Sequence, residues 1–221
     1  MLVGHFAAGM LAKRAAPQAS LGTLTLAAML ADLLGIAFIL VGVERWRIVA
    51  GARGIDSVEL YDIALSHSLA MDLVWGAAFA GVYFWRTRYA AGAGAVFAAT
   101  LSHWVFDVIS HRPDMPLAPG TEARLGLSLW SSVPATLIVE GGLWVAALAV
   151  YLRTTRARGR AGVYGFWPVV ILLTLSWVSN IAAAPPVADV PLWAAALISL
   201  AFFALMIAWT YWLNRVRPAA P

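Results

Sequence analysis

Two histidines and an aspartate recur at every fourth position of one apolar stretch, as His103, Asp107 and His111. Residues four apart lie on one face of an α-helix, so the three side chains form a row. Each ionisable group at the centre of a membrane helix costs about 2.5–3.5 kcal/mol on insertion scales, so the row indicates a functional site. Imidazoles and carboxylates are ligands of zinc, manganese and non-haem iron, and a divalent cation offsets the cost of burying a carboxylate. The row therefore predicts a divalent-metal site.

The spacing limits which members of the row can share one ion. His103 and His111 are separated by about 12 Å along the helix axis, too far for one metal. We expect His103 and Asp107 to bind together, because His103 is closer in depth to Asp32 of an earlier segment. His111, at the membrane surface, is then expected to support a ligand, to face substrate or to bind a second metal.

The composition is typical of a membrane protein. Hydrophobic residues make up 62% of the 221 residues and charged residues only 12%, against about 25% charged residues in soluble domains. The mean hydropathy is +0.80. The chain has no cysteine, which leaves His and carboxylates as the strong metal ligands. The net charge of +4 is not gathered into a basic, aromatic-rich patch, so we expect no nucleic-acid partner.

Apolar segments predict an all-α bundle of six to seven transmembrane helices, forming a single membrane domain over residues 1–221. Six segments have the ~20 residues that a bilayer core requires, and the first is expected to be short, tilted or re-entrant. In the polar stretch that follows the second segment, Asp56-Ser57-Val58-Glu59 is typical of a capping box and predicts a helix start. Three prolines in residues 112–120 predict a stiff loop. The segments are 1–16, 19–42, 63–85, 89–111, 129–152, 164–184 and 190–213.

Basic residues indicate the orientation in the membrane. Loops on one side hold five arginines together with all the loop carboxylates, and the other side holds no loop carboxylate. By the positive-inside rule we expect a multi-pass protein of the inner (plasma) membrane with a cytoplasmic C-terminus. The ten basic residues on the expected cytoplasmic side, out of fifteen, are Lys13, Arg14, Arg86, Arg88, Arg153, Arg156, Arg158, Arg160, Arg215 and Arg217.

Polar residues of several helices share the outer half of the expected bilayer. Counted at 1.5 Å per residue, four of them lie roughly 18–22 Å from the cytoplasmic ends of their helices and two lie about 28 Å from those ends. The four are Asp32, Asp72, His103 and Glu140, and the two are His67 and Asp107. Asp72 lies roughly 140° around its helix from His67 and is expected to make a different contact. We predict metal ligation by His5, Asp32, His67, His103 and Asp107, with Glu140 or His111 as the proton acceptor.

Each residue also has a plainer interpretation. His103 and Asp107 could be a hydrogen-bonded pair that joins two membrane helices. His67, between two serines, suits a capping or interfacial role, and His5 could be a solvated histidine near a terminus. Glu140 could equally be a proton-relay group or a hydrogen-bonded neutral acid.

The order of the motifs resembles a known family. His5, the acidic residue in Ala28-Met-Leu-Ala-Asp32, then Ser66-His-Ser-Leu69 and Ser102-His-Trp-Val-Phe-Asp107 are similar to the LexA-regulated inner-membrane metal-dependent hydrolases (YdjM-like) over about residues 1–112. The chain has Ala31-Asp32-Leu33-Leu34 where the family has Pro-Asp-x-Asp, and Asp62-Ile63 in place of a His-Arg pair. The resemblance implies a metal-dependent hydrolase; a second metal would need Asp62, Asp72 or His111.

Three functions are therefore open. The first is a membrane-embedded hydrolase whose cation, zinc as first candidate, activates water on a phosphoester, amide or lipid substrate. The second is a proton-coupled or small-solute permease that uses the same carboxylates, although alternating access usually involves inverted repeats and a site at the midplane. The third is a haem protein with two axial histidines, or a non-enzymatic membrane subunit.

Overall fold

A computed structural model describes residues 1–48, 58–182 and 191–220. In these ranges the chain is mostly helical, which confirms the all-α prediction, and it adds two short antiparallel ladders. The helices are α1 (Leu2–Ala15), α2 (Leu21–Ala28), α3 (Leu30–Leu40), α4 (Ala64–His67), α5 (Leu69–Thr87), α6 (Ala90–Ser110), α7 (Val133–Thr154), α8 (Gly159–Tyr164), α9 (Phe166–Ala182) and α10 (Leu192–Val216).

Four helical stretches of the described chain are long and apolar enough to cross a membrane: α6, α7, the continuous stretch of α8 and α9, and α10. The bent pair of α2 and α3, which meet at 56°, could form a fifth. The 14-residue α1 is about 21 Å long and thus shorter than a bilayer core of about 30 Å. By length and composition, the structure supports a membrane bundle of four or five spanning helices.

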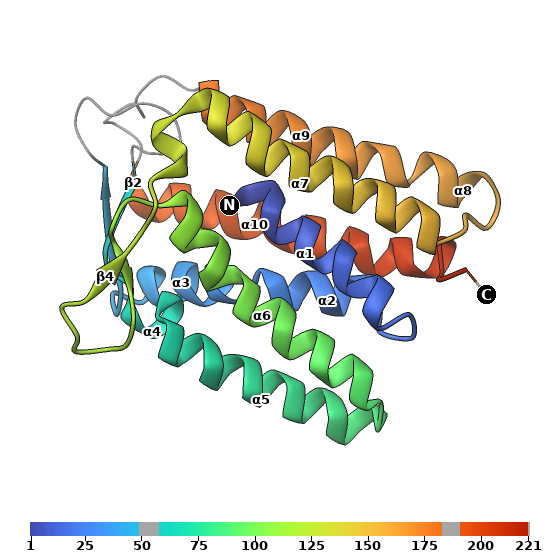
Figure 1. The fold of residues 1–221 in the computed structure, drawn as a ribbon, viewed down its shortest axis with the longest axis horizontal. Coiled ribbons are helices and arrows are strands. Elements are labelled where there is room, and N and C mark those ends of the chain that lie inside the picture. Colours follow the sequence, from blue (N-terminus) through green and yellow to red (C-terminus); the bar gives the residue numbers. More distant parts are fainter. Residues whose placement is uncertain (49–57, 183–190, 221) are drawn as a thin grey trace.

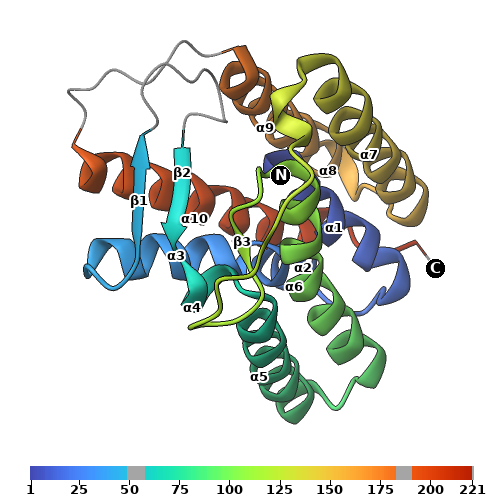
Figure 2. The same ribbon diagram turned by 60° about the vertical axis from the view of Figure 1, so that its left-hand side comes forward.

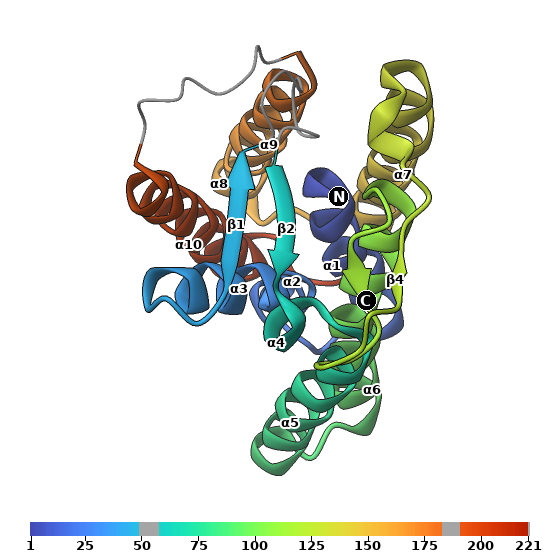
Figure 3. The same ribbon diagram turned by 90° about the vertical axis from the view of Figure 1, so that its left-hand side faces the viewer.

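The ladders lie at one end of the bundle (Figure 1). At the opposite end are the α1–α2, α5–α6 and α7–α8 connections and the C-terminus, which contain the basic residues that the orientation depends on. Figures 2 and 3 show α5 and α6 along one side of the molecule and α7 and α9 along another, with α1 between them. The acidic and basic ends predicted from the sequence are therefore the two ends of the bundle.

The first ladder contradicts the predicted helix start in the polar stretch. β1 (Arg45–Ile48) pairs with β2 (Val58–Asp62), and the next helix begins only at Ala64. The capping-box prediction for Val58 and Glu59 is wrong, because pairing with β1 provides backbone hydrogen bonds that a local cap cannot match. The other two residues of that motif, Asp56 and Ser57, lie outside the described residues.

The second ladder organises the proline-containing segment after α6. β3 (Met115–Pro116) pairs with β4 (Arg124–Leu125), and a short 3₁₀-helix (Leu129–Ser131) leads into α7. The carbonyl of Pro116 accepts a hydrogen bond from the Trp104 indole at 3.0 Å, and the Ser128 backbone N–H donates to the His111 carbonyl at 2.7 Å. The segment is thus fixed to the end of α6, where the predicted ligands lie.

The central helix α1 packs against α2, α6 and α7. A Cβ atom at Gly9 would lie 3.0 Å from the Cα of Thr25 in α2, so the glycine permits this close approach, as helix packing requires. The side chain of His5, one turn earlier in α1, is buried and contacts α6.

Candidate metal centre

Five buried or half-buried side chains form two overlapping groups whose ligand atoms are close enough together to hold a metal ion. The first group is His5, His103 and Asp107, and the second is Asp32, His67 and His103. In each group the ligand atoms lie within 4.8 Å of one another. The residues come from α1, α3, α4 and α6, and His103 belongs to both groups. The five residues predicted from the sequence as metal ligands are therefore neighbours in space.

The shared histidine, His103, has a fixed ring orientation. Its Nδ1 lies 2.7 Å from the carbonyl oxygen of Ala28, the last residue of α2. The final carbonyls of a helix lack partners within the helix, and the bend between α2 and α3 leaves this one available. Because a carbonyl only accepts, Nδ1 carries the proton, and the neutral ring has its lone pair on Nε2.

The Nε2 atom of His103 points at two carboxylates. It lies 3.1 Å from Asp107 Oδ2 and 3.7 Å from Asp32 Oδ1, and it forms no hydrogen bond of good geometry with any described residue. The His103 side chain is completely buried. In the neutral ring, a buried lone pair that faces two anions is unfavourable. Either a proton on Nε2 or a metal cation between the three groups would attract both carboxylates.

His67 is oriented by a chain of hydrogen bonds from a residue that the sequence analysis did not select. The Ser66 hydroxyl donates to Glu44 Oε2 at 2.5 Å, since an ionised carboxylate only accepts. The same hydroxyl lies 2.6 Å from His67 Nδ1 and therefore accepts its proton-bearing N–H. In the neutral ring His67 Nε2 carries the lone pair, and this atom lies 3.5 Å from Asp32 Oδ1.

Glu44 also holds the short helix that carries His67. Its Oε1 accepts hydrogen bonds from the backbone N–H groups of Leu65 and Ser66 at 2.9 and 2.8 Å. N–H groups at the start of a helix have no partner within the helix, and a carboxylate is a favourable acceptor for them. Metal-binding histidines are typically held in this way, with the second ring nitrogen donating to a hydrogen-bonded partner.

His5 lies on the other side of His103. The two imidazole rings are stacked, with centroids 3.8 Å apart and planes 8° from parallel. His5 Nε2 is 3.1 Å from Asp107 Oδ1 and 2.9 Å from the nitrogen of Met1, which itself lies 2.6 Å from the same carboxylate oxygen. Nitrogen atoms of Met1, His5 and His103 thus surround the buried carboxylate of Asp107.

The two residues predicted as proton acceptors lie beside these groups and belong to neither. His111 Nε2 is 4.0 Å from Asp107 Oδ1, and its Nδ1 is 3.3 Å from Asp114 Oδ1. Glu140 accepts hydrogen bonds from the Gly4 backbone N–H at 3.3 Å and from the Trp130 indole at 3.4 Å. Glu140 therefore contacts the turn of α1 that carries His5.

Asp72 makes a contact separate from His67, but the predicted helical angle between them does not apply, because His67 ends α4 and Asp72 lies in α5. Its carboxylate accepts a hydrogen bond from the backbone N–H of Trp104 at 3.2 Å, which joins α5 to α6. Sequence reasoning missed Glu44 and the role of the Ser66 hydroxyl. The adjacency of Ser66 and His67 was the only local signal, because Glu44 resembles any other loop carboxylate.

Comparisons of the chain with family models, with curated proteins and with solved structures found no match. The fold and the His/Asp groups define a mostly helical, membrane-type bundle with a possible metal site.

Proposed function

We propose that this protein is a membrane-embedded, metal-dependent hydrolase, the function that its resemblance to the inner-membrane hydrolase family also implies. The observation that carries the proposal is the buried His103 Nε2 atom, which lies 3.1 Å from Asp107 Oδ2 and 3.7 Å from Asp32 Oδ1 and forms no hydrogen bond of good geometry within the described residues. One divalent cation, with zinc as the first candidate, would be held at His103 Nε2, with its other ligands from the two groups that share this histidine. His5 and Asp107 of the first group and Asp32 and His67 of the second can supply these ligands, all of types that zinc accepts. Three protein ligands in all leave one position of the ion open to water.

A zinc ion with an open position supplies an activated water, because it lowers the pKa of that water to about 7. Of the two predicted proton acceptors, His111 is better placed than Glu140. Both carboxylate oxygens of Glu140 already accept hydrogen bonds, whereas Nε2 of His111 faces the site and Nδ1 faces Asp114. Glu140 then supports the turn that carries His5.

We further propose six to seven membrane crossings, with α1 and α5 inside the bilayer. The basic end of the bundle faces the cytoplasm, so the ladders and the metal site lie toward the outside. The chain has no cysteine, so single cysteines can report the side. Arg158→Cys and Glu122→Cys, both at exposed positions, should react with an impermeant thiol reagent from opposite sides of the membrane. Labelling of both from outside would contradict this orientation.

The main experiment measures metal content and turnover together. Purified native protein and His103→Ala are compared for bound zinc and for hydrolysis of phospholipids, phosphomonoesters and acyl amides in liposomes. We expect about one zinc per native chain and turnover that the variant loses. A zinc-loaded native sample without turnover above the variant, together with solute or proton flux that the variant abolishes, would favour the permease. A visible spectrum of the same sample tests for haem.

A further inference from the structure

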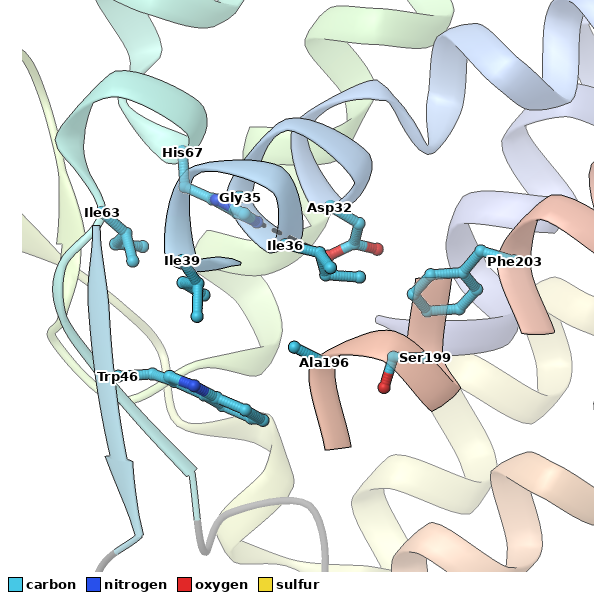
Figure 4. A pocket seen from close by; sticks show the side chains of 10 residues that line it. All are labelled: Asp32, Gly35, Ile36, Ile39, Trp46, Ile63, His67, Ala196, Ser199 and Phe203. Carbon is cyan, nitrogen blue, oxygen red and sulfur yellow. Dashed lines mark ion pairs between the residues drawn. The ribbon is translucent and has the colours of Figure 1, made fainter. Parts of the chain in front are cut away.

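The open side of the metal site leads into a cavity of about 150 Å³ between α3, α10 and β1. Figure 4 shows Asp32 and His67 on one side of it, with the ion pair between them marked, and Ala196, Ser199 and Phe203 of α10 on another. The indole of Trp46, from β1, forms a further wall. The cavity therefore touches the second ligand group directly.

The accessibility of the two carboxylates shows which part of the site the cavity reaches. The side chain of Asp32 is 27% exposed, whereas that of Asp107 is 3% exposed. His67 also lines the cavity, but His5, His103 and Asp107 do not. A molecule in the cavity would consequently reach the ligands through Asp32 and His67.

The cavity is polar at the ligand end and mostly apolar elsewhere. Its walls include Ile36, Ile39 and Ile63 together with the ring of Phe203. An apolar cavity of about this size accommodates a group as large as benzene, which corresponds to a segment of a hydrocarbon chain rather than a whole lipid. A sugar or an amino acid would leave its polar groups unpaired against these isoleucines.

The wall contains a polar atom that has no hydrogen-bond partner in the described part of the chain. The indole Nε1 of Trp46 is buried and forms no hydrogen bond with any residue in the described ranges. Buried polar groups are normally satisfied, so a donor of this kind in a cavity wall suits an oxygen atom of a ligand. On α10, the two residues that follow the cavity-lining Ala196 are exposed on the surface of the bundle, Leu197 by 46% and Ile198 by 68%.

From the cavity we infer a substrate class: the hydrocarbon chain of a membrane lipid ester occupies this space, with its ester group beside Asp32 and His67. The inference rests on the proposed hydrolase, for which it names the substrate. The surrounding bilayer supplies such chains at high local concentration, and an amphiphile matches both the polar end and the apolar walls.

Photo-crosslinking in vesicles tests the inference on the full chain. The probe is phosphatidylcholine that carries a diazirine on one acyl chain, and labelled residues are located by mass spectrometry. Ile198, on the exposed face of α10, reports ordinary contact with lipid. The measured quantity is the labelling of Ile36, Ile39 and Phe203 relative to Ile198.

Ala196→Trp fills the cavity, and Leu197→Trp places the same side chain on the neighbouring exposed position. We expect the first variant to lower the relative labelling at least fivefold and the second to leave it unchanged, with native zinc content in both. Ser199→Phe, which fills the same space from the next turn, provides the test if the first variant does not fold. Unchanged relative labelling in the cavity-filling variants would overturn the inference.

The outcomes separate this inference from the proposed function. Suppose that the protein binds zinc and turns over a water-soluble ester, but that Ala196→Trp does not change the labelling. That result would reject the lipid cavity, and the proposed hydrolase would still stand. Labelling that Ala196→Trp abolishes, in a protein that binds no zinc and turns over no ester, would reject the hydrolase, and the space would be a lipid-binding cavity only.

Discussion

The two ligand groups around His103 differ in how their side chains are held. We call His5 and Asp107 the closed arm and Asp32 and His67 the open arm. The closed arm lies between long packed helices, and the carboxylate of Asp107 is almost completely buried. The open arm includes a histidine on a four-residue helix and a carboxylate that borders a cavity. A buried closed arm, which would hold the metal, and an accessible open arm thus share His103.

The comparison has a physical basis in the cost of burying charge. Asp107 has lost nearly all contact with water, so its charge depends on the nitrogen atoms of Met1, His5 and His103 around it. Asp32 keeps access to the cavity, where water can solvate it. The closed arm should therefore determine metal affinity, and the open arm should determine how substrate reaches the metal.

The largest effect is expected from His103→Ala, which removes the member common to both arms. We expect bound zinc to fall from about one per chain to under about a tenth, because removing even the partners of a ligand typically costs 10–100-fold in affinity. Metal analysis after dialysis measures the change. Ser102→Ala is the matched control, since within the described ranges the Ser102 hydroxyl bonds only to its own helix, at Ala99. Native zinc content in His103→Ala would refute the shared site.

The next effect compares the carboxylates of the two arms. Asp107→Asn should weaken zinc binding about 100-fold and Asp32→Asn about tenfold, because water from the cavity can replace the lost oxygen only in the open arm. Competition with a chelator gives both dissociation constants, and thermal unfolding in excess zinc shows that both variants fold. Equal losses would remove the distinction between an anchor and an accessible side.

The pair of His103 and Asp107 was the easiest part of the site to predict from the sequence. The helical spacing of His103 and Asp107 is a local pattern, and their depth could be compared with that of Asp32 by counting residues. The predicted six to seven membrane crossings are not confirmed, because α1 is only about 21 Å long and α5 is not among the candidate spans. Local patterns therefore located the ligands better than the helices that carry them.

The support of the open arm could not be predicted, because it depends on contacts between distant residues. Glu44 reaches Ser66 across 22 positions only because β1 and β2 pair and reverse the chain. Ala28 offers its carbonyl to His103 only because the chain bends between α2 and α3. Neither the pairing nor the bend has a signal in the spacing of apolar residues.

A smaller effect is expected from Ser66→Ala, which interrupts the hydrogen bonds from Glu44 to His67. The His67 ring loses its fixed orientation, so zinc affinity should fall about tenfold, with the closed arm still in place. Ser68→Ala is the matched control on the other side of His67. The Ser68 hydroxyl caps α5 by accepting from the Met71 N–H, so its loss should cost about 1 kcal/mol of stability and leave zinc affinity unchanged. Similar zinc affinities for the two variants would show that Ser66 does not orient a ligand.

The smallest effect is expected from Gly35→Ala in the open arm. A Cβ atom at Gly35 would lie 2.9 Å from Cε1 of His67 and 3.1 Å from the Ser66 hydroxyl, so the imidazole must move by a few tenths of an ångström. We expect zinc affinity to fall about threefold, less than for Ser66→Ala, because the ring keeps its hydrogen bond and only its position changes. Gly81→Ala in α5, where a Cβ would meet nothing within 4 Å, should leave affinity unchanged and stabilise the helix slightly. If Gly35→Ala binds zinc like the native protein while Asp32→Asn does not, the open arm consists of Asp32 alone, and His67 serves the cavity rather than the metal.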